Sequence, residues 1–324
     1  VFEDVFDTHS NILVGTHADI SDEGQTVHRP GIKTTAVDSA TGSKSMIASE
    51  TVSITDTVSY TDLTVGKEYT VTGTLMNADT GEALKDASGK IITSSTTFTP
   101  TASNGTVDVQ FKDVYIPFSV SRTVVFEDVF DTHSNILVGT HADISDEGQR
   151  VSRPGVGTTA TVDGNKSISL EGKTDNRTLT VTDTVSYSNL TVGKTYRAEA
   201  VLMLSDGTPT QYTNIVTFTP TTPDGTIDVP VTFATRGLCT ANNSSTSLVV
   251  FEKVYDIAEA GESQDGDVLM AHHEDLTDAN QTISITRVWG VTRTGETFSL
   301  VSAIGAVLVA AGATVLVVRR KRRV

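Results

Sequence analysis

The chain opens with VFEDVFDTHSNILVGTHADISDEGQ at residues 1–25, and the same stretch recurs without a change at residues 125–149. A third, diverged copy begins with Val250-Phe-Glu252 and ends with HEDLTDANQ at 273–281. Two further repeated pairs lie between these copies: TDTVSYTDLTVGKEY (55–69) with 182–196, and TFTPTASNGTVDV (97–109) with 217–229. Similar segments in the same order predict tandem copies of one structural unit.

The order of these segments predicts the domain boundaries. Arg-Pro-Gly at 29–31 and 153–155 marks two short linkers. The predicted parts are a C-terminal fragment of a preceding repeat (1–29), two full repeats (30–152 and 153–285), a sorting-motif linker (286–297), a transmembrane helix (298–318) and a basic cytoplasmic tail (319–324). Because the chain begins at Val1 with neither methionine nor a signal peptide, we interpret it as part of a longer precursor.

The full repeats have the composition of β-strands. They are rich in Thr, Val, Ser and Tyr, with alternating apolar and polar positions and turn signals at Ser103-Asn-Gly105 and Pro223-Asp-Gly225. No long helical period precedes the apolar segment near the C-terminus. We therefore expect an all-β chain of tandem immunoglobulin-like β-sandwiches.

Charge and composition exclude several functions. The 324 residues carry a net charge of −16, and five of the 24 basic residues lie at 319–323, so the remainder is more acidic still. An acidic body excludes a nucleic-acid-binding protein. The single cysteine, Cys239, permits no intrachain disulfide and is interpreted as a buried apolar residue or an incidental thiol.

The C-terminal segment has the pattern of a membrane anchor. Phe298 to Val318 contain no charge, and at ~1.5 Å per residue they can cross a bilayer core of ~30 Å. The basic cluster that follows favours a cytoplasmic C-terminus over the alternative of a buried core helix. Upstream lies a short motif made of Val291, Thr292, Arg293, Thr294 and Gly295.

This layout resembles the cell-wall sorting signal of Gram-positive surface proteins. The resemblance implies that a sortase cuts between Thr294 and Gly295 and links the threonine to peptidoglycan. Val291 and Thr292 stand where that family has Leu and Pro. An unusual sortase and simple membrane retention therefore both remain open.

Each repeat ends with one spacing of polar residues, in which a His precedes an Asp by five positions and a Gln by eight. The three sets are His17, Asp22 and Gln25; His141, Asp146 and Gln149; and His273, Asp278 and Gln281. A Val-Phe-Glu stretch precedes each set and contributes Glu3, Glu127 and Glu252. Each full repeat opens with Thr-Thr-Ala, at 34–36 and 158–160.

These residues resemble the VaFE-type repeats of Gram-positive adhesins, whose domains carry an intramolecular Thr–Gln ester bond. The resemblance implies CnaB-like sandwiches in which a threonine of the first strand attacks a glutamine amide of the last and releases ammonia. It implies the cross-links Thr34–Gln149 and Thr158–Gln281, with His141 and His273 as bases and with Glu127/Asp146 and Glu252/Asp278 as acidic pairs. An adjacent base activates a hydroxyl, and a carboxyl pair held close retains a proton that it can donate.

Strand alternation bears on which threonine reacts. Ile32, Thr34 and Ala36 share one face of a strand, as do the matching residues of the second repeat. We prefer Thr34 and Thr158, with Thr35 and Thr159 as the alternative in a shifted register. Thr57 and Thr184 are a weaker third choice.

Three other chemistries compete for these residues. A cation site could use His17, Asp19 and Asp22, although no four-ligand spacing is present, so we predict no metal. A Ser-His-Asp hydrolase lacks a serine in a nucleophile-elbow context. A lysine isopeptide bond could use Lys33, but Gly157 occupies the matching position in the second repeat.

We predict the structural stalk of a cell-wall-anchored adhesin, a protein that is not an enzyme beyond one ester per domain and that needs no cofactor. The expected partners are sortase, peptidoglycan, the membrane through 298–318, and a host surface ligand bound by a distal head outside this chain. The alternative is that the repeats themselves bind host protein or glycan, although an aromatic content of 6% argues against a sugar platform. In residues 1–29 we expect Glu3, His17, Asp22 and Gln25 to form a set without a cross-link, because no threonine strand precedes them.

Overall fold

The computed structural model describes residues 1–27, 29–239, 244–257 and 266–289. These residues form β-strands and turns with one short 3-10 helix, η1 (Glu23–Gln25), and no α-helix, which confirms the predicted all-β fold. Within these ranges no helix is long and apolar enough to span a membrane. The predicted span at 298–318, the sorting motif at 291–295 and the basic tail at 319–324 lie outside the described residues.

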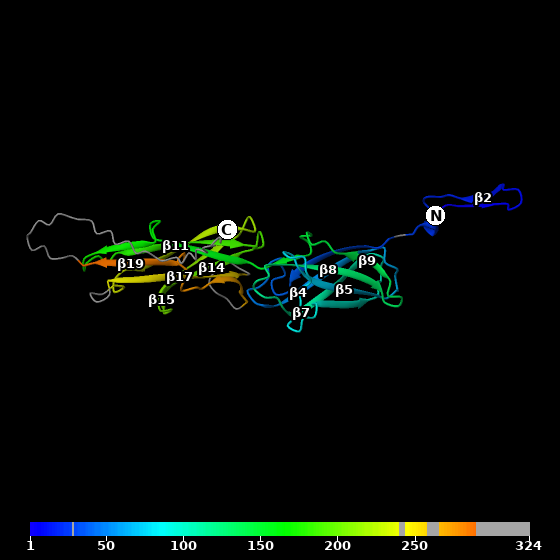
Figure 1. Cartoon of the computed structure of the whole chain (residues 1–324). Helices are drawn as coiled ribbons and strands as arrows, with labels where there is room; N and C mark the ends of the chain where they lie inside the picture. Colours follow the sequence, from blue (N-terminus) through cyan, green and yellow to red (C-terminus); the bar gives the residue numbers. More distant parts are fainter. Residues whose placement is uncertain (28, 240–243, 258–265, 290–324) are drawn as a thin grey trace, which may run out of the picture. The chain divides into compact units, whose positions relative to one another are not determined.

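The first full repeat is a sandwich of two sheets, coloured blue to green in Figure 1. One sheet has the order β3 (Gly31–Asp38), β4 (Thr51–Thr61) and β7 (Gly105–Tyr115). The other has the order β10 (Arg150–Ser152), β8 (Arg122–Asp131), β5 (Tyr69–Asn77) and β6 (Thr93–Phe98), with β9 (Leu137–His141) paired to β8. All of these pairs are antiparallel.

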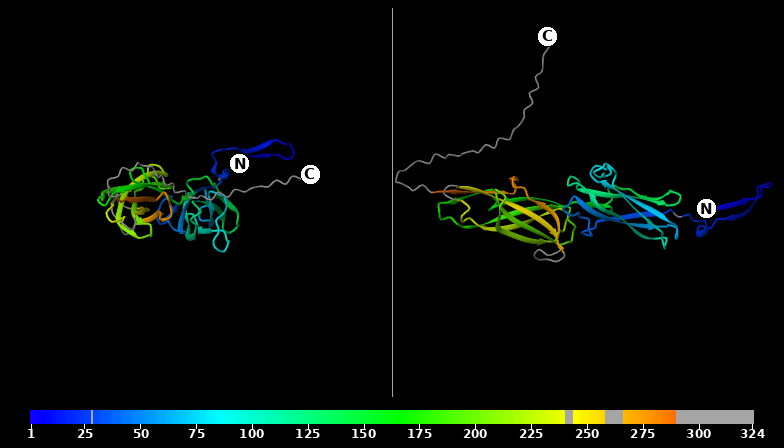
Figure 2. Two further views of the ribbon diagram at one scale, coloured as in Figure 1. Left: turned by 60° about the vertical axis from the view of Figure 1, so that its left-hand side comes forward. Right: turned by 90° about the horizontal axis from the view of Figure 1, so that it is seen from below.

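The second repeat has the same plan, and Figure 2 shows both sandwiches from two further sides. Its smaller sheet has the order β11 (Gly155–Thr161), β13 (Thr178–Ser188) and β16 (Gly225–Ala234). Its larger sheet has the order β12 (Ser167–Glu171), β19 (Thr282–Val288), β17 (Ser245–Asp256), β14 (Tyr196–Leu204) and β15 (Pro209–Phe218), with β18 (Val268–His273) paired to β17. The pairing of β12 with β19 is parallel.

Strand alternation builds the core of each sandwich. In β4 every second side chain is buried, so Val52, Ile54 and Val58 face the opposite sheet. Asp56 lies in the same buried row and has no exposed surface. A carboxyl group at an apolar position is costly unless the site around it uses it.

The N-terminal copy forms a hairpin of its own. β1 (Glu3–Phe6) pairs with β2 (Leu13–His17), and in the described structure no further strand extends this sheet. Its sequence is that of β8 and β9, yet side chains such as Phe2, Val5 and Leu13 are exposed. The interpretation of residues 1–29 as part of a preceding repeat stays a prediction.

Candidate functional site

The closing hairpin of each repeat sets Glu opposite His. Glu127 on β8 is the cross-strand partner of His141 on β9, and Glu252 on β17 is the partner of His273 on β18. The N-terminal hairpin repeats the arrangement with Glu3 and His17. The register of one hairpin is therefore enough to set these two residue types opposite each other.

The aspartate that follows each histidine holds its ring. His141 Nε2 lies 3.0 Å from Asp146 Oδ2, and the matching distance between His273 and Asp278 is 3.1 Å. With Nε2–H donating to the aspartate, a neutral ring would present Nδ1 as an acceptor. In both full repeats Nδ1 is buried without a hydrogen-bond partner among the described residues.

The opening strand of each repeat supplies the buried threonine. Thr34 on β3 is 6% exposed and Thr158 on β11 is 5% exposed, whereas the neighbouring Thr35 and Thr159 are exposed. Thr34 Oγ1 has no hydrogen-bond partner of normal geometry. It nevertheless lies close enough to the carboxyl groups of Asp56 and Glu127 to lower the pKa of both. Burial thus favours the first threonine of each Thr-Thr pair.

Thr57 and Thr184 are bonded elsewhere. The Thr57 hydroxyl donates to Asp108 at 2.7 Å, and the Thr184 hydroxyl donates to Asp228 at 2.7 Å. Both threonines lie out of phase with the buried row of their strand, so the geometry does not favour them as nucleophiles.

Backbone hydrogen bonds join the threonine strand to the glutamine segment. Ala36 N–H donates to Gly148 O at 3.0 Å, and Ala160 N–H donates to Asn280 O at 2.8 Å. In each case the accepting residue directly precedes the glutamine of the set. Gln149 and Gln281 are fully buried. The first and last parts of each repeat therefore meet where the threonine and the glutamine lie.

The glutamine amides have different contacts in the two sandwiches. Gln149 Nε2 donates to Glu127 Oε2 at 2.8 Å and to His141 O at 3.2 Å. Gln281 Nε2 instead donates to the backbone oxygens of Val250 (2.6 Å) and His273 (2.9 Å). Gln281 Oε1 accepts from Asp275 N–H at 3.2 Å. The backbone N–H of Asp275 is thus a donor of the kind that stabilises negative charge developing on an amide oxygen.

A second carboxyl group faces the glutamate. Asp56 on β4 interacts directly with Glu127, and Asp183 on β13 raises the pKa of Glu252 by charge repulsion. Burial raises the pKa of Glu127 to about 11 and that of Glu252 to about 9. Burial also raises the pKa of Asp56, and it raises that of Asp183 to about 7. Two carboxyl groups in one buried site retain a proton, and the glutamate holds it more tightly.

The structure groups the carboxyl groups differently from the predicted acidic pairs Glu127/Asp146 and Glu252/Asp278, whose roles stay predictions. Asp146 and Asp278 contact the histidine rings. The carboxyl groups close to Glu127 and Glu252 are instead those of Asp56 and Asp183. Asp56 and Asp183 directly precede Thr57 and Thr184 in the repeated TDTVSY and were not among the predicted site residues. An Asp in the apolar phase of an alternating strand was the available signal.

The N-terminal hairpin contains part of the same arrangement. His17 Nε2 lies 2.9 Å from Asp22 Oδ2, and Gln25 follows in η1. In the described structure no threonine strand pairs with this hairpin. The set is therefore incomplete at residues 1–27.

The remaining sequence candidates lie outside these clusters. Lys33, the candidate for an isopeptide bond, is exposed, and Cys239 is buried. Among the described residues no group of three or more His, Cys, Asp or Glu side chains could hold a metal ion. His17, Asp19 and Asp22 therefore do not form such a group.

The arrangement contains the groups that formation of a Thr–Gln ester would require. The threonine hydroxyl lies near an aspartate carboxyl in both repeats. The glutamine amide contacts the Glu127 carboxyl in the first repeat and Asp275 N–H in the second, and both glutamines are fully buried. Attack of the hydroxyl oxygen on the amide carbon would form a C–O bond and break the C–N bond. The hydroxyl proton would leave with the nitrogen as ammonia.

Comparison with known proteins gives two family matches. The model of the T-Q ester bond containing domain matches residues 30–153 and 154–285. The model of the LPXTG cell wall anchor motif matches residues 293–324, which indicates sortase processing and attachment to the cell wall. No curated protein sequence matches the chain.

Solved structures resemble the chain only distantly. A bacterial adhesin from Mobiluncus mulieris containing intramolecular disulfide, isopeptide and ester bond cross-links aligns at 11% identity and a TM-score of 0.33, covering 80% of this chain and 99% of its own. A glycosyl hydrolase family 2 member from Bacteroides cellulosilyticus aligns at 10% identity and a TM-score of 0.28, covering 72% of this chain and 28% of its own.

Proposed function

We propose that this chain, which belongs to the family of T-Q ester bond containing domains, is a self-cross-linked stalk of a cell-wall-anchored surface adhesin. The observation that carries the proposal is the seam in each repeat, where the strand of a buried threonine is hydrogen-bonded to the residue directly before a buried glutamine. The proposed cross-links are Thr34–Gln149 and Thr158–Gln281.

Each side chain of the site has a proposed role. Ionised Asp56 accepts the Thr34 hydroxyl proton, and Glu127 passes its own proton to the leaving nitrogen of Gln149. His141, held by Asp146, relays protons between the carboxyl pair and the nitrogen, so that ammonia leaves and the site regains its starting charge. In the second repeat these roles fall to Asp183, Glu252, His273 and Asp278.

The position of the proposed ester suits a protein that bears force. β3 begins the first repeat and β10 ends it, so a bond between Thr34 and Gln149 joins its two ends. After β10 the buried Arg153 donates to Ile47 O and Ile116 O, and β11 begins at Gly155. Tension would thus pass from one cross-link to the next without unzipping a sheet.

The anchor completes the proposal. We place sortase cleavage between Thr294 and Gly295, with Thr294 joined to peptidoglycan. The segment 298–318 would hold the precursor in the membrane until cleavage, and a distal head outside this chain would bind the host ligand.

Force spectroscopy tests the stalk directly. Pulled by its two ends, the chain should show no extension from the residues enclosed by each ester. The T34A/T158A variant should lengthen by roughly 400 Å per sandwich, since each loop holds more than a hundred residues at ~3.3–3.6 Å each. The T35A/T159A variant is the matched control and should behave like the wild type. Full unfolding of the wild-type sandwiches would argue against a covalent load path.

A further inference from the structure

Each sandwich holds one lysine against the seam between its threonine strand and its glutamine segment. Lys44 Nζ donates to both Ala36 O and Gly148 O. Lys166 Nζ in the second sandwich donates to Asn280 O, the matching position. Neither lysine belongs to the sets of residues described above.

The acceptors of Lys44 belong to the two segments that must meet. Ala36 follows Thr34 by two residues on the same face of β3, and Gly148 directly precedes Gln149. One ammonium therefore ties both backbones, in addition to the hydrogen bond from Ala36 N–H to Gly148 O. Strand register also sets Ala36 opposite Asp56, and it sets Ala160 opposite Asp183.

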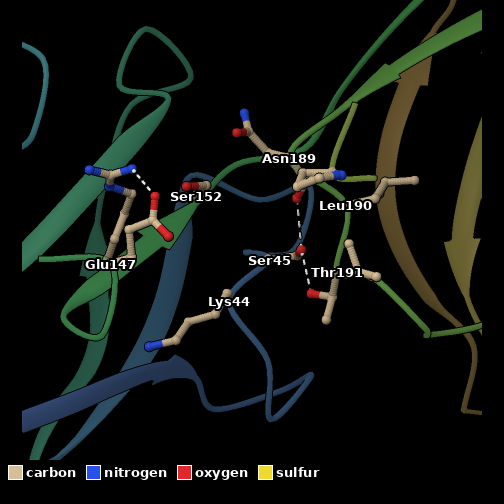
Figure 3. Close-up of a pocket in the computed structure, with 10 residues that line it drawn as sticks. Lys44, Ser45, Glu147, Ser152, Asn189, Leu190 and Thr191 are labelled. Carbon is tan, nitrogen blue, oxygen red and sulfur yellow. Dashed lines mark hydrogen bonds and ion pairs between the residues drawn. The ribbon is translucent and has the colours of Figure 1, made fainter. Parts of the chain in front are cut away.

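Figure 3 shows how Lys44 leaves the chain beside Ser45. Its side chain extends away from Ser45, and its amine is directed toward a blue strand, β3. The lysine lines a pocket together with Glu147, Arg150 and Ser152. The residue thus borders the pocket, and its amine reaches the backbone oxygens of Ala36 and Gly148.

We propose that Lys44 and Lys166 are positioning residues for ester formation: each ammonium holds the carbonyl before the glutamine in place beside the threonine strand and sets a positive charge near the aspartate of the carboxyl pair. This inference rests on the proposed function. A fixed near-attack geometry lowers the entropic part of the barrier, so a lysine that touches neither reacting atom can still set the rate.

The charges around the aspartate agree with this role. Burial raises the pKa of Asp56, and the positive charge of Lys44 acts in the opposite direction. Burial also raises the pKa of Asp183, and among neighbouring charges Lys166 lowers it most. The groups that act on Asp56 are Glu127, Thr34, Lys44 and His141. Lys44 thus favours the ionised form of Asp56.

The test compares K44M and K44R in the full chain. The chains are made by cell-free synthesis at several pH values and sampled into denaturant, and ammonia loss is followed by the masses of proteolytic fragments. K44M should slow ester formation in residues 30–152 by about tenfold or more, and K44R should recover most of the rate. The acidic limb of the profile of rate against pH should move to higher pH in K44M, because without the lysine charge Asp56 ionises only at higher pH.

Three comparisons serve as controls. In K44M the second sandwich should form its ester at the wild-type rate, and in K166M only the second sandwich should be slowed. K33M should change the rate of neither sandwich, because Lys33 is exposed. K44M and K44R reacting at equally reduced rates, or a K44M rate reduced by one factor at every pH, would overturn the role of the charge. Wild-type rates in K44M would overturn the inference while leaving the ester intact, whereas a wild-type chain without ammonia loss would overturn the proposed function itself.

Discussion

Replacing Thr34 and Thr158 by alanine should lower the thermal unfolding temperature of each sandwich by about 15–25 °C. Each proposed ester closes a loop of more than 100 residues, and the chain-entropy model assigns such a closure about 4.7 kcal/mol at 25 °C. In a domain of this size 1 kcal/mol corresponds to roughly 3–5 °C. Calorimetry of the single variants should show the drop only in the sandwich that carries the substitution.

The neighbouring threonines supply the matched control for this experiment. Thr35 and Thr159 lie on the same strands but are exposed, so T35A and T159A should leave the unfolding temperature within a few degrees of the wild type. Q149A and Q281A should reproduce the effect of the threonine variants, because either partner is needed for the bond. Equal unfolding temperatures in T34A and T35A would rule out Thr34 as the cross-linked residue.

Replacing Asp183 by asparagine should slow ester formation in the second sandwich by a factor of about 10² or more. Asparagine has nearly the same volume but cannot accept the hydroxyl proton, and proton transfer by a positioned side chain contributes roughly 10²–10⁴ in rate. A time course of ammonia loss in the fragment 153–285 measures the effect. The first sandwich of the same chain reports whether the preparation is otherwise competent.

The control for D183N is D163N. Asp163 is exposed in the same sandwich and has φ of 50°, a conformation that asparagine also adopts readily. The D163N variant should cross-link at the wild-type rate. If D183N cross-linked as fast as D163N, the second carboxyl group of the site would have no part in the reaction, and His273 would be left as the base.

The hairpin part of the site could be predicted from sequence because it is local. Glu127, His141, Asp146 and Gln149 lie within one repeated stretch, and strand pairing with a short turn is enough to bring Glu and His together. The inward position of Thr34 could also be predicted, since alternation along one strand determines which side chains share a face.

The contribution of Asp56 and Lys44 could not be read in the same way. Asp56 lies on another strand, and its contact with Glu127 depends on how two sheets pack, which no local pattern encodes. Lys44 acts through backbone oxygens, which every residue has, so no partner residue type marks it in the sequence. The parallel pairing of β12 with β19 likewise joins segments far apart in the chain.

The intact mass of the purified chain tests the central claim most directly. Each Thr–Gln ester releases one ammonia, so the wild-type chain should be lighter than its sequence mass by two ammonia molecules. A loss of three is not expected, because Gln25 has no threonine strand in the described structure. The T34A and T158A variants should each lose one ammonia, and the double variant none. A wild-type chain at its full sequence mass would contradict the account.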